Sequence, residues 1–248
     1  MAFFEIVLCF FIISSVYASV GFGGGSSYLA ILALNNLPFK EIRFVALLCN
    51  IVVVTSAVVI FIHRNEVSWR KIIPLVILSI PMAYLGASIK LSEHIFFLTL
   101  GVTLMISSAF LWVKTRSVLS SEESNRNYFL PNALLGGFIG FLSGMVGIGG
   151  GIFLSPLLNL LKWDTAKKIA IASSIFILVN SISGISGQLL HISQDIPWLR
   201  ISALIITVFI GGQVGSRLLV TTFSHLMIRR ITSLLVFIAG VEVIIKHI

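Results

Sequence analysis

The residues best suited to chemistry are two runs of five residues that each contain four glycines. The first run is Gly21-Phe22-Gly23-Gly24-Gly25, and the second, 126 positions later, is Gly147-Ile148-Gly149-Gly150-Gly151. Glycine costs about 1 kcal/mol relative to alanine inside a helix, and it adopts positive φ freely. Each run therefore predicts a break in a membrane-embedded helix, followed by a new short helix.

A helix that begins after such a break leaves its first amides without carbonyl partners and carries the positive end of the helix dipole. Amides of consecutive glycines also form concave nests that attract anions. We expect the short helices to begin at Ser26-Ser27-Tyr28 and at Ile152-Phe153-Leu154-Ser155. Two such helix ends that meet inside the protein would bind a small oxyanion without a buried lysine or arginine. The alternative is that the glycines permit close helix packing, but two copies at matched positions favour a substrate site.

Further hydrogen-bonding side chains follow each run, and they complete the predicted site. Alignment of the two copies pairs Asn50 with Ser174 and Ser56 with Asn180. A nucleotide-binding loop is excluded, because no strand precedes either run and no lysine follows it. We expect no catalytic residue, no metal ligand and no cofactor. The predicted substrate-binding residues are Gly21, Gly23, Gly24, Gly25, Ser26, Ser27, Asn50, Ser56, Gly147, Gly149, Gly150, Gly151, Ser174 and Asn180.

The composition indicates that these residues lie in membrane helices. Hydrophobic residues make up 57% of the chain and charged residues 10%, and the mean hydropathy is +1.07. Soluble proteins average roughly 45–50% apolar and about 25% charged residues. Between the charged clusters lie apolar runs of about 20 residues, the length a helix needs to cross the hydrocarbon core. We predict an all-α, polytopic integral membrane protein of the bacterial inner membrane, with spans near 43–62, 70–89, 94–113, 167–188, 197–216 and 227–246.

Charge placement defines the expected partners. The first 20 residues are apolar, but they lack the basic start of a secretory signal, since the first lysine or arginine is Lys40. The net charge of +8 is spread over short segments between helices, which favours contact with anionic lipid headgroups over nucleic-acid binding. The expected partners are a small anionic substrate and membrane lipids, with no nucleic acid, and a homo-oligomer is compatible with the sequence.

The chain divides into two repeats of one motif. Downstream of the glycine runs His63 aligns with His191, Trp69 with Trp198, and Gly86 with Gly215. We predict a first transmembrane repeat at 1–113, a polar linker at 114–130 and a second transmembrane repeat at 131–248. Each repeat is expected to hold one glycine-broken segment and three transmembrane helices.

The broken segments, 2–34 and 131–161, have two alternative paths. If both cross the membrane, the lysines and arginines divide eight to nine between its faces. If both are re-entrant hairpins, the division is twelve to five, with the larger group in 63–71, 114–130, 162–168 and 217–230. Basic residues concentrate on the cytoplasmic face, so the count favours hairpins. Each repeat then makes three crossings, an odd number, and the two are inverted repeats with both chain ends on the outer face.

The paired GFGGG and GIGGG runs, the neighbourhoods of Asn50 and Asn180, and the chain length of 248 residues resemble the TauE/SafE sulfite exporter family, also called TSUP. The resemblance covers nearly the whole chain. It implies export of sulfite, organosulfonates or related sulfur-containing oxyanions by alternating access, coupled to the proton motive force. One departure is that the two half-sites differ chemically, because asparagine and serine exchange places between the copies.

Two other functions remain as alternatives. A passive anion channel would use the same fixed dipoles. An intramembrane protease is suggested by Gly184-Ile185-Ser186-Gly187, with His191 or His225 as the base. Ser186 and His191 lie five residues apart on one predicted helix, where side chains do not face each other. We therefore expect a transporter and not an enzyme.

Overall fold

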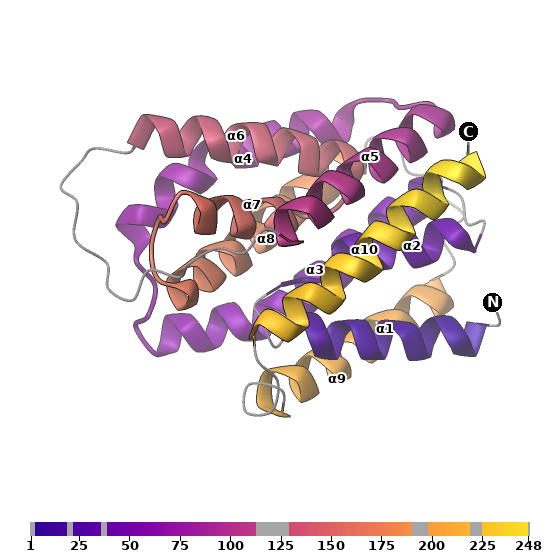
Figure 1. Ribbon diagram of the computed structural model, residues 1–248, viewed down its shortest axis with the longest axis horizontal. Coiled ribbons are helices and arrows are strands. Elements are labelled where there is room, and N and C mark those ends of the chain that lie inside the picture. The colour runs from indigo at the N-terminus through magenta and orange to yellow at the C-terminus, as the bar shows by residue number, and fades with distance from the viewer. Residues whose placement is uncertain are drawn as a thin grey trace.

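The computed structural model describes residues 3–18, 22–35, 39–112, 129–189, 198–218 and 225–247. These residues are helical apart from short connections, and Figure 1 shows the helices side by side with both chain ends at the same end of the molecule. Of the predicted linker 114–130, residues 114–128 lie outside the described part. The helices are α1 (Phe3–Ala18), α2 (Gly25–Leu34), α3 (Phe39–His63), α4 (Trp69–Ser88), α5 (Glu93–Trp112), α6 (Phe129–Val146), α7 (Gly151–Leu160), α8 (Ala166–Gln188), α9 (Trp198–Leu218) and α10 (His225–His247).

Within the described residues, six helices are long and apolar enough to cross a membrane, namely α3, α4, α5, α6, α8 and α9. Five of them correspond to predicted spans, which confirms a polytopic α-helical membrane protein. The sixth is α6, whereas the prediction placed the sixth span in α10. Of α10, the apolar stretch found over described residues is Val236–Ile245. The helix α6 has 18 residues because the second glycine break falls late, and α10, with 23 residues, covers the predicted span 227–246.

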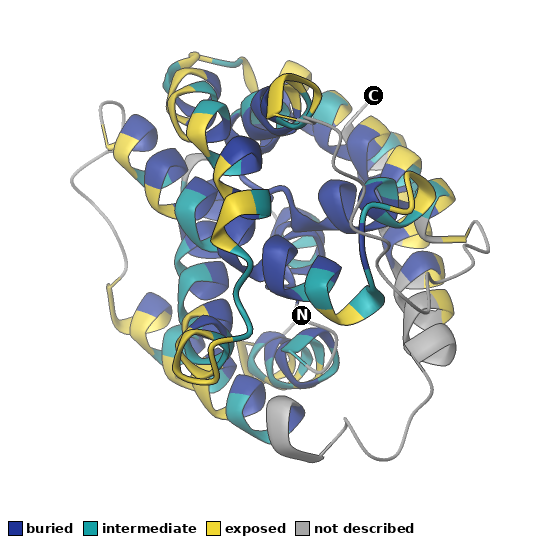
Figure 2. Ribbon diagram, turned by 90° about the vertical axis from the view of Figure 1, so that its left-hand side faces the viewer, coloured by how far each residue is buried: buried dark blue, intermediate teal, exposed yellow. Residues whose placement is uncertain are grey.

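The outer surface is apolar, as a lipid-facing surface must be. Large side chains such as Phe4, Phe138 and Leu199 are 74%, 66% and 86% exposed. Figure 2 shows the exposed residues on the outward faces of the helices and the buried residues facing inward. Because lipid tails are as apolar as these side chains, no hydrophobic force holds membrane helices together, and close packing must do so.

Glycines provide that close packing away from the two breaks. On α6, glycines recur every fourth residue and rest on the backbone of α4, where a Cβ on Gly140 would lie 2.6 Å from the carbonyl oxygen of Ser79. On α9, Gly211 and Gly215 lie against α1 in the same way. These contacts are small-xxx-small packing. Outside the two runs, the glycines of α6 and α9 therefore serve close helix packing.

The order of the contacts gives the relative direction of packed helices. Gly136 lies at Leu75 and Gly144 at Ala83, so α6 and α4 run parallel. Likewise Gly211 lies at Phe11 and Ser14, and Gly215 lies at Ser15, so α9 and α1 run parallel. These two parallel pairs each join a helix of the first half to a helix of the second.

Two other pairs run antiparallel. In α5 and α10, Gly101 packs against Ile244, whereas Ser108 accepts a hydrogen bond of 2.9 Å from Ser233. In α3 and α8, Leu47 faces Gly184, while three residues further along α3 the side chain of Asn50 lies near that of Ile177. Each antiparallel pair joins helices that hold the same place in the two halves.

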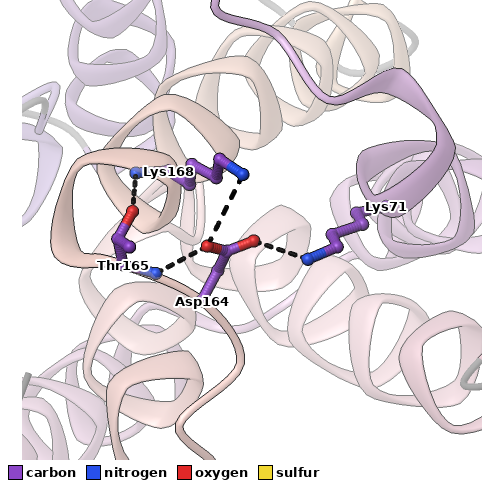
Figure 3. A network of polar contacts seen from close by, with 4 residues as sticks. All are labelled: Lys71, Asp164, Thr165 and Lys168. Atoms are coloured by element: carbon purple, nitrogen blue, oxygen red, sulfur yellow. Dashed lines mark hydrogen bonds and ion pairs between the residues drawn. The ribbon is translucent and has the colours of Figure 1, made fainter. Parts of the chain in front are cut away.

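A charged cluster joins the α3–α4 connection to the α7–α8 connection (Figure 3). Asp164 is buried, and its carboxylate accepts from Lys71 at 2.7 Å and lies 3.9 Å from Lys168. Beside it, Lys167 bonds Glu66 at 2.6 Å. The two connections therefore lie at the same end of the molecule.

We expect Asp164→Asn to lower the stability of the protein by about 1–3 kcal/mol, because the neutral amide loses the charge-assisted contacts of the carboxylate to Lys71 and Lys168. The figure is below that of a fully buried pair because the side chains of Lys71 and Lys168 are 39% and 40% exposed. The measurement is thermal unfolding in detergent. Glu66→Gln is the control, since its partner Lys167 is 66% exposed. Equal destabilisation by both variants would contradict the prediction.

Candidate functional site

The two glycine runs form the same local structure. The short helix α2 begins at Gly25 behind Gly24, which has φ +85°, and α7 begins at Gly151 behind Gly150, which has φ +83°. Both short helices have 10 residues, and neither has a side-chain hydrogen bond at its N-cap. The predicted short helices are thus confirmed, each starting one residue earlier than expected.

The first amides of both short helices are left for another partner. In α2, the amides of Ser27 and Tyr28 bond the carbonyl of Gly24 at 3.0 Å. In α7, the amides of Phe153 and Leu154 bond the carbonyl of Gly150 at 3.1 and 3.0 Å. The two amides that precede these in each helix have no carbonyl of their own helix to bond. The breaks are buried, so water does not freely replace that partner.

The two breaks meet at Asn50 of α3. Its side chain is fully buried, and Nδ2 donates to the carbonyl of Ile148, inside the second break, at 2.8 Å. A Cβ on Gly25 would lie 2.6 Å from that same carbonyl oxygen, and a Cβ on Gly149 would lie 2.7 Å from Asn50 Nδ2. Gly23 likewise leaves room for Asn50 Oδ1. Glycine is needed here because any side chain would occupy the space that Asn50 fills.

Ile177 of α8 occupies the place that matches Asn50, and this corrects the sequence alignment. Cβ atoms on Gly23 and Gly149 would each lie 3.2 Å from Cγ2 of Ile177, and Gly151 leaves room for the same side chain. Ser174, which the alignment paired with Asn50, instead donates to the carbonyl of Ala170 at 3.0 Å. The alignment paired Asn50 with Ser174, three residues before Ile177. Three residues are about one helical turn, and the serine-rich sequence of α8 aligns equally well when shifted by one turn.

The other predicted residues divide into three groups. Gly21 lies outside the described residues. Ser26 and Ser27 are buried in the first turn of α2, and Ser27 Oγ lies 2.7 Å from the hydroxyl of Tyr17. The hydrogen bonds found for Ser56 and Asn180 go to carbonyls of their own helices, those of Val53 at 3.2 Å and Phe176 at 2.8 Å, and do not join them to a break.

Arg43 is a buried arginine that was not among the predicted site residues. The predicted span 43–62 begins at this residue, whereas α3 begins at Phe39, so Arg43 lies inside the helix and is 5% exposed. Its Nη2 donates to Gly144 at 3.0 Å and Ala87 at 3.3 Å, in the last turns of α6 and α4. Gly147, with φ +86°, passes beside its stem, where a Cβ would lie 3.1 Å from that of Arg43. The negative ends of two helix dipoles thus hold the guanidinium, which fixes the entrance to the second break.

The motif that suggested a protease lies in α8. Ser186 is exposed, and its hydroxyl donates to the carbonyl of Ile182 at 3.0 Å. His191 lies outside the described residues. In the part of the chain that the structure describes, no group of three or more His, Cys, Asp or Glu side chains could hold a metal ion.

The fold and the site define a class of protein, a multi-pass membrane protein with two buried helix breaks at its centre. Comparison with known proteins defines the family. The family described as "Sulfite exporter TauE/SafE" matches residues 6–243. The chain therefore belongs to the TauE/SafE family and is a membrane transporter, not an enzyme.

Individual relatives agree. The chain is 30% identical over 249 aligned residues to the probable membrane transporter protein y4hK of Sinorhizobium fredii, covering 96% of this chain and 97% of that protein. It is 28% identical to a probable membrane transporter of Haemophilus influenzae, over 75% of this chain and 72% of the relative. The chain is also 36% identical to the probable membrane transporter protein YunE of Bacillus subtilis, over a match that covers 40% of this chain and 36% of that relative. No solved structure matches the chain.

Proposed function

We propose that this transporter exports a small sulfur-containing oxyanion, sulfite or an organosulfonate, across a bacterial inner membrane. The observation that carries the proposal is the meeting of two uncapped short-helix N-termini around Asn50. Each terminus offers amide donors and the positive end of a dipole. The substrate class comes from the family, since dipoles and amides attract any compact oxyanion.

The two breaks serve one site, because they touch each other. The carbonyl of Ile148 lies against Gly25 and accepts the hydrogen bond from Asn50. An anion bound here would replace its hydration shell with amides from both halves. Burial strengthens each of these contacts, since the effective dielectric constant inside a protein is far below that of water.

We infer further that residues 1–113 and 131–248 are inverted repeats joined by the 114–130 linker. Three observations support this arrangement. Helices in equivalent places, α3 with α8 and α5 with α10, run antiparallel. The packed pair α4 and α6 has its counterpart in α9 and α1. The ion pairs of Asp164 and Glu66 join the α3–α4 connection to the α7–α8 connection. If segment 131–161 crossed the membrane, these two connections would lie on opposite faces, so the ion pairs support a re-entrant hairpin.

The first broken segment also folds back in a way that suits a hairpin. Phe10 of α1 stacks on Tyr28 of α2, with ring centroids 4.6 Å apart. Eighteen residues of straight helix would separate these rings by about 27 Å. Inverted repeats that meet at a midplane site provide alternating access, because each half can take the conformation of the other. We propose this mechanism, coupled to the proton motive force.

Proteoliposomes that contain the purified protein test the proposal. We expect flux of sulfite, sulfoacetate or thiosulfate that saturates with concentration and responds to an imposed pH gradient. A passive channel is the second candidate, because fixed dipoles also suit conduction. Large unitary currents in planar bilayers would favour the channel over the carrier. No flux of any of the three anions above empty liposomes would contradict the proposed function.

A further inference from the structure

The second glycine break is lined by buried hydroxyl groups that have no partner among the described residues. Ser143 of α6 and Ser181 of α8 are 1% and 0% exposed, and neither Oγ forms a hydrogen bond within the described part of the chain. Buried polar atoms in proteins are almost always bonded, and a missing ligand is one reason for an exception. Both serines are close to glycines of the same run.

Their positions point at the N-terminus of α7. A Cβ on Gly150 would lie 3.2 Å from Ser143 Oγ, and a Cβ on Gly149 would lie 2.9 Å from Ser181 Oγ. These two glycines immediately precede α7, whose first amides have no side-chain cap. The two hydroxyls and the uncapped amides therefore surround one end of one short helix.

The first break has no serine hydroxyl at the matching positions, and the buried hydroxyl there that has no partner among the described residues is that of Tyr28, 2.9 Å from a Cβ on Gly24. The two glycine runs lie 126 positions apart, which matches Ser143 with Tyr17. Asn50 and Ile177 lie 127 positions apart, which matches Ser181 with Val54. The hydroxyl of Tyr17 is already bonded to Ser27 at 2.7 Å, and valine has no polar group. The matched position of Asn50 is the apolar Ile177. Chemically, the two halves of the site are unequal.

We propose that Ser143 and Ser181 are substrate-binding residues that donate hydrogen bonds to an oxyanion held at the N-terminus of α7. The assignment rests on the proposed function and makes it more specific. The oxyanion binds to the second break, and the first break completes the site through its dipole and through Asn50. Such a set of donors suits an anion with at least two acceptor oxygens, as in sulfite or a sulfonate group.

The test is thermal unfolding of the purified protein in detergent with and without sulfite, for the native chain, Ser143→Ala and Ser181→Ala. Without anion, both variants should unfold at or above the native temperature, because each removes an unsatisfied buried hydroxyl. With sulfite, each should bind roughly ten- to 100-fold more weakly, as expected when a hydrogen bond to a charged group is lost. Ser186→Ala is the control on α8, because its exposed hydroxyl bonds its own helix.

The outcomes separate this assignment from the proposed function. Native affinity in both variants, alongside a clear response of the native protein, overturns the serine assignment alone. Variants that are less stable without anion and unchanged in affinity show a packing role and also overturn it. If sulfite, sulfoacetate and thiosulfate all leave the native unfolding temperature unchanged, both the proposed function and the serine assignment fail.

Discussion

The double variant Gly24→Ala/Gly150→Ala is expected to lose at least about 100-fold in transport rate, the scale on which a displacement of about 1 Å acts at a site of reaction. Both glycines have φ near +85°, a conformation that strains an alanine. A Cβ on Gly24 would lie 2.9 Å from the Tyr28 hydroxyl, and one on Gly150 would lie 2.7 Å from the ring of Phe176. Relief of these contacts must shift both N-caps and turn the first amides away from the site.

The measurement is the initial rate of sulfite flux into proteoliposomes, normalised to correctly folded protein. Gly212→Ala is the matched control, because a Cβ at Gly212 meets Val53 at an ordinary 3.7 Å and the residue lies inside the regular helix α9. We expect native transport from this control. Native transport from the double variant, with both proteins equally abundant and monodisperse, would show that the glycine caps do not form the site.

Asn50→Asp is expected to weaken anion binding by about 1000-fold. Two like charges about 4 Å apart at an effective dielectric constant near 20 repel by about 4 kcal/mol, and each 1.4 kcal/mol is a factor of ten. Asn50 is the polar side chain that touches both breaks. A carboxylate there would repel the oxyanion and also face the carbonyl of Ile148.

Comparison with Asn50→Leu isolates the effect of charge, since leucine loses the same hydrogen bond to Ile148 without adding a negative charge. We expect this variant to bind about 10- to 100-fold more weakly than the native protein, on the scale of a lost hydrogen bond from Asn50 to the charged anion. Asn159→Asp near the end of α7 is the control for an added charge, since Asn159 is bonded to Ser155 of its own helix. Equal affinity of the aspartate and leucine variants, measured by sulfite titration, would contradict an anion at Asn50.

The glycine pattern was sufficient to predict the short helices and their starts within one residue. Positive φ and close approach to Asn50 are properties that only glycine supplies, so four glycines in five positions strongly indicate a break of this kind. The membrane class followed in the same way from apolar runs and sparse charge. The ion pairs of Asp164 and Glu66 could not be predicted, because they join residues 93 and 101 positions distant in sequence.

The polar part of the site was predicted less well, for a physical reason. Helices α3 and α8 run antiparallel through the centre, so the residue opposite Asn50 depends on helix rotation and not on a pairwise alignment. Ile177 carries no polar signal that would suggest it. Ser181 stood in a serine-rich helix where spacing alone did not distinguish the face toward α7 from the face toward lipid. The burial of Arg43 was not predicted, because the span was expected to start at 43 whereas α3 starts earlier, at Phe39.

The most direct test of the central claim is a crystal structure of the protein grown with selenite, measured at the selenium absorption edge. Selenite has the shape and charge of sulfite, and selenium gives an anomalous signal that locates it. We expect one anomalous peak between the N-termini of α2 and α7, placed so that selenite oxygens can accept hydrogen bonds from Ser143, Ser181 or Asn50. A peak elsewhere in the protein, with none between these helix ends, would contradict the claim that the paired glycine breaks bind the anion.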